Sequence, residues 1–202
     1  MGLISNGTTI FDAGAMSLGG KITFIKKLTA SGSATLSFVG GASGVVLDNT
    51  YKEYLFTFKD IHPSVDNRRL TFNMSIDGGS NYNIAKSSTY FYAYNFENDG
   101  GAALEYNGSG DLAQGTGFQE ITTEIGSDND QCSAGTLHLF NPSSTTFVKH
   151  FIAITNDAQS ENRDYANYTG GYGNTTSAVN AIQFKMNGGN IDAGDISLYG
   201  IS

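Results

Sequence analysis

The chain has 202 residues, enough for one domain of ordinary size. Its 26 Gly, absent Trp and 15% charged residues exclude a coiled coil, and its many Phe and Tyr residues argue against disorder. A net charge of −8 without a dense basic cluster argues against nucleic-acid binding. This composition favours an all-β domain with many turns.

The first twenty residues differ from the rest of the chain. Residues 1–20 mix Gly, Ser and Asn with scattered apolar residues that follow no steady period. Such a segment cannot bury Ile4, Ile10 and Phe11 by itself. We therefore predict an extended N-terminal docking arm over residues 1–20 that packs these three side chains on a neighbouring subunit. The domain itself would span residues 21–202.

Short runs of alternating apolar and polar residues dominate the domain, which is the pattern of half-buried strands. No window shows apolar residues at helical spacing between a cap and a stop. About ten strands at this spacing predict a jelly-roll-like two-sheet β-sandwich. The predicted strands cover residues 21–28, 33–39, 54–58, 70–76, 88–94, 118–125, 135–140, 146–155, 182–186 and 194–201.

The phase of the alternation predicts which side chains face the core. On residues 146–155 it places His150 on the same inward face as Ile152, and on residues 135–140 it turns His138 outward. The residues predicted to be buried are Leu70, Phe72, Met74, Ile76, Leu137, Leu139, Ile152, Ile182, Phe184 and Leu198.

Gly-rich segments separate these runs. The sequences at residues 77–81 and 187–190 supply the positive φ angles that a tight hairpin needs. Two long loops, at about 95–117 and 156–177, are rich in Gly, Asn, Ser and Tyr. Long loops in compact domains are often functional, although solvated crossovers are an equal alternative here.

The residue patterns of common catalytic and metal sites are missing. His62, His138 and His150 form no metal-binding motif, and Cys132 lies in an acidic loop that would raise its thiol pKa. The acidic stretch at 124–130 lacks the ligand spacing of a calcium loop, so a solvated loop is favoured there over a Ca²⁺ site. We predict no catalytic residues, no cofactor and no metal, and hence no enzyme.

Tyrosines form the strongest candidate contact surface. Tyr90, Tyr92 and Tyr94 share one face of a predicted strand, while Tyr165, Tyr168 and Tyr172 fall in the second long loop. Exposed Tyr among Ser, Gly and Asn makes an adaptable contact surface. A subunit interface is the favoured use. Stacking on a host surface glycan is the alternative, which the lack of Trp weakens.

Several stretches carry a resemblance to a known group of proteins. These are residues 48–63, the turn at 75–83, the stretch 137–143 and the C-terminal 194–201. In this order they resemble small virion structural proteins of marine tailed bacteriophages, described as tail or fibre proteins. The resemblance covers about residues 30 to 201. It implies a virion component without catalysis, and jelly-roll modules of such appendages imply a homotrimer.

The favoured function is therefore a non-enzymatic structural subunit of a tailed-phage virion, of the tail appendage or fibre type. It would contact itself and other virion proteins. Alternatives are a capsid decoration or head-fibre protein and a glycan-binding receptor module that uses the Tyr-rich loops. The start of the chain lacks the pattern of a signal peptide, and no stretch suits membrane insertion. We expect folding in the host cytoplasm and final location in the virion.

Overall fold

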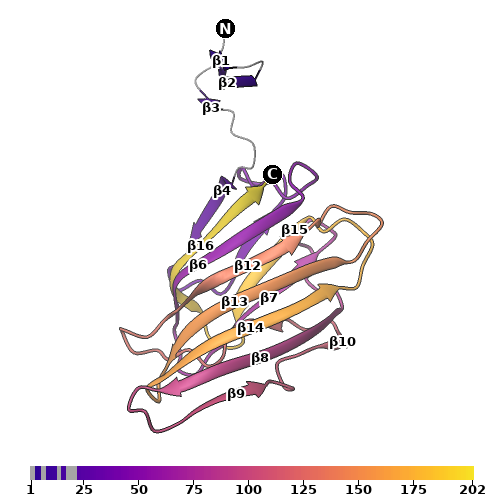
Figure 1. Ribbon diagram of the computed structural model, residues 1–202. Coiled ribbons are helices and arrows are strands. Elements are labelled where there is room, and N and C mark those ends of the chain that lie inside the picture. Colours follow the sequence, from indigo (N-terminus) through magenta and orange to yellow (C-terminus); the bar gives the residue numbers. More distant parts are fainter. Residues whose placement is uncertain (1–2, 6–7, 13–14, 17–21) are drawn as a thin grey trace.

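The computed structural model describes residues 3–5, 8–12, 15–16 and 22–202, and it describes side chains from residue 22 onward. These residues contain no helix. Two antiparallel sheets of unequal size pack face to face, with the larger one in front in Figure 1. The predicted all-β sandwich is therefore confirmed.

The larger sheet has nine strands. Eight of them follow the order β10-β8-β14-β13-β12-β6-β16-β4, and β9 pairs with the C-terminal half of β8. The strands are β4 (Ile22–Thr29), β6 (Glu53–Pro63), β8 (Lys86–Phe96), β9 (Ala102–Tyr106), β10 (Ala113–Gly115), β12 (Ser133–Phe140), β13 (Lys149–Gln159), β14 (Arg163–Gly173) and β16 (Ile191–Ile201).

The smaller sheet has four strands in the order β11-β7-β15-β5. They are β5 (Leu36–Val39), β7 (Leu70–Ser75), β11 (Gln119–Glu120) and β15 (Ala181–Met186). Across the two sheets the pairing is nested, because β6 pairs with β16, β7 with β15, β8 with β14, and β12 with β13. This outside-in pairing is jelly-roll-like.

The N-terminal residues contain three short strands. They are β1 (Leu3–Ser5), β2 (Thr8–Asp12) and β3 (Ala15–Met16), which form an antiparallel sheet of their own. The backbone of Ile4 pairs with Thr9, and that of Phe11 with Leu3. The side chains of Ile4, Ile10 and Phe11 lie outside the described part of the structure, so their docking on a partner stays a prediction.

Aromatic rings form the centre of the sandwich. Phe184 of β15 contacts Phe56, Phe58 and Phe72 with ring centroids 5.3, 5.4 and 6.3 Å away, and Phe72 meets Phe151 at 5.0 Å. The rings therefore join the two sheets directly. Burial is confirmed for eight residues of the predicted core, namely Leu70, Phe72, Met74, Leu137, Leu139, Ile182, Phe184 and Leu198.

The prediction of burial was wrong for two isoleucines. Ile76 is 41% exposed because β7 ends at Ser75, which leaves Ile76 in the following turn. Ile152 is 49% exposed because β13 has the opposite phase from the one predicted. Phe151 and Ala153 face the core instead, and His150 points to solvent with Ile152.

A buried lysine explains the phase of β13. Lys149 is completely buried, which a hydrophobicity pattern does not anticipate. Its ammonium donates hydrogen bonds to the backbone oxygens of Ser144, Phe147 and Thr175 at 2.7, 2.6 and 3.2 Å. Because these carbonyls replace the water that the charge loses, Lys149 can occupy an inward position and tie two loops to β13.

Both predicted long loops contain strands. The region 156–177 holds the end of β13 and all of β14, and the region 95–117 holds β9 and β10. Polar side chains occupy the inward positions of β14, where Asn167 and Thr169 are buried. The expected apolar alternation is therefore missing from a regular strand. Conversely, of the strand predicted at residues 118–125 only β11, Gln119–Glu120, forms.

The predicted Gly-rich turns form, but they do not make hairpins. Gly78 and Gly79 adopt positive φ angles of 70° and 84°, which Gly tolerates without strain. The Asp77 carboxylate accepts hydrogen bonds from the Ser75 hydroxyl and from Asn81, and these hold its pKa at about 2. This turn leads from β7 in the small sheet towards β8 in the large one.

The aromatic centre gives a stability prediction. Phe72→Ala should lower the free energy of unfolding by about 3–5 kcal/mol, because it removes a fully buried ring and leaves a cavity. Urea denaturation followed by fluorescence or circular dichroism measures the change. The matched control is Phe147→Ala, the same substitution at a residue that is 67% exposed, which should change stability by less than about 1 kcal/mol. Equal effects at both positions would contradict the assigned core.

Candidate functional site

The outer face of the large sheet carries exposed apolar side chains in cross-strand register. Tyr106, Phe91, Tyr168 and Ile154 are successive partners across β9, β8, β14 and β13. Phe91 and Tyr168 stack at 5.1 Å with an interplanar angle of 7°. We name this surface the outer-face patch; it consists of Phe91, Leu104, Tyr106, Ile152, Ile154 and Tyr168, all exposed.

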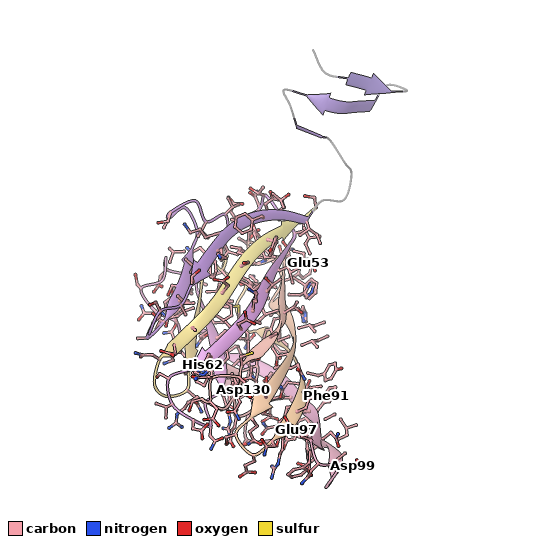
Figure 2. All side chains as sticks on the ribbon, turned by 90° about the vertical axis from the view of Figure 1, so that its left-hand side faces the viewer. Glu53, His62, Phe91, Glu97, Asp99 and Asp130 are labelled. Atoms are coloured by element: carbon pink, nitrogen blue, oxygen red, sulfur yellow. The ribbon has the colours of Figure 1, made fainter. Side chains whose placement is uncertain are left out.

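The patch is open and shallow. Figure 2 shows Phe91 projecting from the same side of the sandwich as Glu53 of β6, away from the small sheet. Beside the Phe91 and Tyr168 stack lies a depression of about 230 Å³, which Ile152 and Gly170 also line. No atom lies within 4 Å of where a side chain on Gly170 would begin, so the sheet surface is bare at that point.

The predicted tyrosines divide between the two faces of the sheet. Tyr168 and Tyr172 belong to the outer face, where Tyr172 lies 5.9 Å from the ring of His150. Tyr90, Tyr92, Tyr94 and Tyr165 lie on the opposite face, and all six are on strands rather than in loops. Tyr90 is completely buried and donates a hydrogen bond to Asn167, so its proposed contact with a partner is wrong.

The inward tyrosines adjoin a buried polar network centred on Asp157. Its carboxylate accepts hydrogen bonds from the backbone N–H and hydroxyl of Thr123 at 2.8 and 2.6 Å, from the Ser133 hydroxyl at 3.1 Å and from the Asn167 amide at 2.9 Å. Burial raises the pKa of Asp157 to about 6, and the four hydrogen bonds oppose that rise. The network joins the segment that follows β11 to β12, β13 and β14 through hydrogen bonds.

Beside this network lies a small polar cleft, which we name the tyrosine cleft. Its volume is about 170 Å³, and Arg69, Tyr92, Thr123, Glu124, Gln159 and Tyr165 contribute to its wall. Arg69 donates to Glu120 at 3.2 Å and to Glu124 at 2.7 Å. Burial raises the pKa of Glu120, and the charge of Arg69 opposes the rise.

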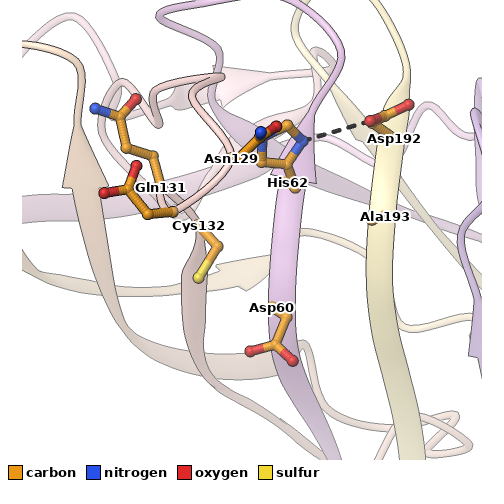
Figure 3. Close-up of a pocket in the computed structure, with 8 residues that line it drawn as sticks. Asp60, His62, Asn129, Gln131, Cys132, Asp192 and Ala193 are labelled. Carbon is orange, nitrogen blue, oxygen red and sulfur yellow. Dashed lines mark ion pairs between the residues drawn. The ribbon is translucent and has the colours of Figure 1, made fainter.

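A larger pocket of about 390 Å³ lies at the ends of β6 and β16. In Figure 3, His62 and Asp192 face one another from these two strands, 3.6 Å apart, while Cys132 lies across from them. Burial, and then the charge of Asp60, raise the pKa of the Cys132 thiol. The thiol is therefore protonated at neutral pH, which disfavours nucleophilic chemistry.

The structure gives no support for the calcium alternative. Within residues 22–202, no three or more His, Cys, Asp or Glu side chains are arranged to hold a metal ion. In the 124–130 loop, Glu124 pairs with Arg69, and the backbone N–H of Ser127 donates to Asp66. Part of this acidic stretch is therefore engaged in contacts within the fold.

Sequence reasoning missed Arg69 and Gln159, which complete the tyrosine cleft, and it weighed Glu124 only as part of a calcium loop. Arg69 reads as half of an isolated basic pair, and Gln159 falls in a segment predicted as a loop. One signal was available: from Thr155 the alternation of β13 continues through Asp157 to Gln159 on the inward face. If buried polar residues are accepted at inward positions, this alternation extends the predicted strand to Gln159.

No family model matches the sequence, and no curated protein or solved structure shows significant similarity to it. No helix in the part of the chain that the structure describes is long and apolar enough to cross a membrane. The outer-face patch and the tyrosine cleft are two surfaces of the sandwich that suit binding.

Asp157 gives a prediction for the dependence of stability on pH. A carboxyl group with a folded pKa of about 6, above its unfolded value of 3.8, stabilises the fold most below the unfolded pKa and loses that contribution as the pH rises through 6. This group should therefore lower the free energy of unfolding by up to about 3 kcal/mol between about pH 4 and pH 6.

Urea denaturation across this pH range measures the effect. Asp157→Asn removes the titrating group and should flatten the profile between pH 4 and pH 6, whatever its absolute stability. Asp164→Asn, at an exposed position of β14, is the matched control and should retain the wild-type profile. A wild-type slope in Asp157→Asn would show that this carboxyl does not titrate there.

Proposed function

We propose that this protein is a non-enzymatic structural subunit of a tailed-phage virion, of the tail appendage or fibre type. The observation that carries the structural role is the outer-face patch. The virion assignment rests on the resemblance of residues 30 to 201 to phage tail and fibre proteins. In this proposal the patch is the contact between copies of the chain.

The composition of the patch supports a protein contact. The register row from Tyr106 to Ile154 contains no charged side chain. The two neighbouring cross-strand rows also lack charged side chains. One row consists of Leu104, Ala93, Ala166 and Asn156, and the other consists of Thr89, Gly170 and Ile152. An uncharged, aromatic area on a chain of net charge −8 has the composition of an interface core.

The nearest alternative is a capsid decoration or head-fibre protein. Both functions require an assembly surface, so geometry alone does not separate them. Mass spectrometry of purified particles tests whether the protein is a virion component at all, and its copy number then distinguishes the two. Hundreds of copies would favour decoration, whereas a few to dozens would favour an appendage. Absence from the particles would overturn the virion assignment.

Assembly gives a prediction for the isolated protein. We expect a homo-oligomer, most simply a closed trimer, that persists at high salt because the patch offers few ion pairs to screen. Ile152→Asp should reduce it to monomers, since a carboxylate in the contact would lose its water without gaining a partner. Mass photometry and light scattering at several protein concentrations measure the change.

The matched control is Phe147→Asp, which places the same charge at an exposed apolar residue outside the patch. It should retain the wild-type oligomer. An Ile152→Asp variant of unchanged size would show that the patch is not the contact. A wild-type monomer at high micromolar concentration would mean that other virion proteins, rather than copies of this chain, hold the subunit in place.

The arm gives a separate prediction. Deleting residues 1–20 should leave a folded sandwich that no longer incorporates into particles, because, among the residues that the structure describes, β1, β2 and β3 pair only with one another. Circular dichroism and thermal unfolding test the fold, and a complementation assay with purified particles tests incorporation. Unfolding of the truncated chain would instead place the arm within the domain's core.

A further inference from the structure

The tyrosine cleft lies at the β11 edge of the smaller sheet. The edge strand β11 and the segment after it approach β13 and β14 here, and β8 continues beyond them. Polar atoms make up most of its wall. At about 170 Å³ it is smaller than the roughly 300–1,000 Å³ of sites for drug-sized ligands, so its size suits a single ring.

The wall contains a buried acceptor without a partner. Gln159 is 6% exposed, and its Oε1 has no hydrogen-bond partner among the residues that the structure describes. Its Nε2 donates to Glu124 at 3.3 Å, which fixes the amide. Arg69 also binds the carboxylate of Glu120, and Oε2 of that carboxylate has no hydrogen-bond partner among the described residues either. A buried polar atom of this kind needs an explanation, and a ligand donor would provide one.

The charged groups of the cleft are held rigidly and balance one another. Arg69 lies between the carboxylates of Glu120 and Glu124, so its positive charge is already compensated. A ligand anion would meet the Glu124 carboxylate in the wall and would gain little from the compensated guanidinium. The remaining oxygen atoms and N–H groups instead suit a neutral molecule that both donates and accepts hydrogen bonds.

Aromatic rings complete one side of the cleft. Tyr165 packs against Tyr92 and Tyr94, with ring centroids 5.3 and 5.5 Å away. The hydroxyl of Tyr92 donates to Glu105 at 3.0 Å, which fixes its ring while leaving it half-buried. A rigid tyrosine presents an apolar surface at low entropic cost.

We propose that the tyrosine cleft binds one ring of a neutral saccharide. Sugar hydroxyls would donate to the free acceptor of Gln159 and bond to the groups around Glu124, and the C–H face of the ring would lie on Tyr92. The size, the balanced charge and the combination of amide, carboxylate and tyrosine all suit this ligand class. The site is on the opposite face of the sheet from the outer-face patch, so the inference is independent of assembly.

Binding can be tested on the full-length protein with defined sugars. The probes are the methyl glycosides of glucose, galactose, mannose and N-acetylglucosamine, with N-acetylneuraminic acid as the anionic comparison. Saturation-transfer NMR detects binding, and calorimetry measures the dissociation constant. We expect at least one neutral glycoside to bind with a constant on the order of 1 mM, and the anionic sugar to bind more weakly.

Two variants assign the site. Tyr92→Ala and Gln159→Leu should each weaken binding by about tenfold or more, through loss of the ring surface and of the acceptor. The matched control is Phe91→Ala, because Phe91 is the chain neighbour of Tyr92 on the opposite face of β8. It should leave the dissociation constant unchanged. Thermal unfolding of each variant checks the fold, and Tyr92→Ala, at a half-buried position, serves if Gln159→Leu is unstable.

Several results would overturn the proposal. One is the absence of binding by every neutral glycoside at tens of millimolar, roughly ten times the expected constant. Others are preferential binding of the anionic sugar, or unchanged affinity in Tyr92→Ala. Loss of binding in Phe91→Ala alone would place the saccharide on the outer-face patch instead.

Discussion

The mismatch between nine strands and four is the constraint on which this structure depends. A sheet buries apolar side chains only where another layer covers it. Here the small sheet covers the middle of the large one, where Phe72, Phe151 and Phe184 form the aromatic centre. The rest of the large sheet must satisfy its side chains in other ways. On the inner face this produces the buried polar network around Asp157 and the tyrosine cleft beside it.

On the inner face, buried polar groups supplement the apolar packing between the two sheets. Lys149 and Lys86 occupy one cross-strand row, because both pair with Gly173 of β14. The ammonium of Lys86 donates to Asn73 and to the backbone oxygen of Ile84, and burial lowers its pKa to about 7. Together with Asp157, these groups close the inner face through hydrogen bonds. Such buried networks are favourable only when their members are satisfied, so the few unpaired atoms near Gln159 are conspicuous.

The sequence predicts the fold well where the core is apolar and poorly where it is polar. Strand β7 lies under the aromatic centre, and its alternation correctly assigned Leu70, Phe72 and Met74 to the core. Strands β13 and β14 bury Lys149, Asp157 and Asn167. An apolar pattern there gives either the wrong phase or no strand at all. The cleft escaped prediction because its residues come from strands far apart in sequence, and the bonds that bury them exist only after folding.

The two candidate surfaces lie back to back on the same strands. Phe91 and Tyr92 are adjacent in sequence, yet the pleat of β8 sends one to the outer-face patch and the other to the tyrosine cleft. A contact that covers the patch would therefore leave the cleft open. In a closed ring of subunits each copy would then present its own cleft, and several weak single-ring sites would act together. The proposed assembly contact and the proposed saccharide site thus need no common residue, although they share β8, β13 and β14.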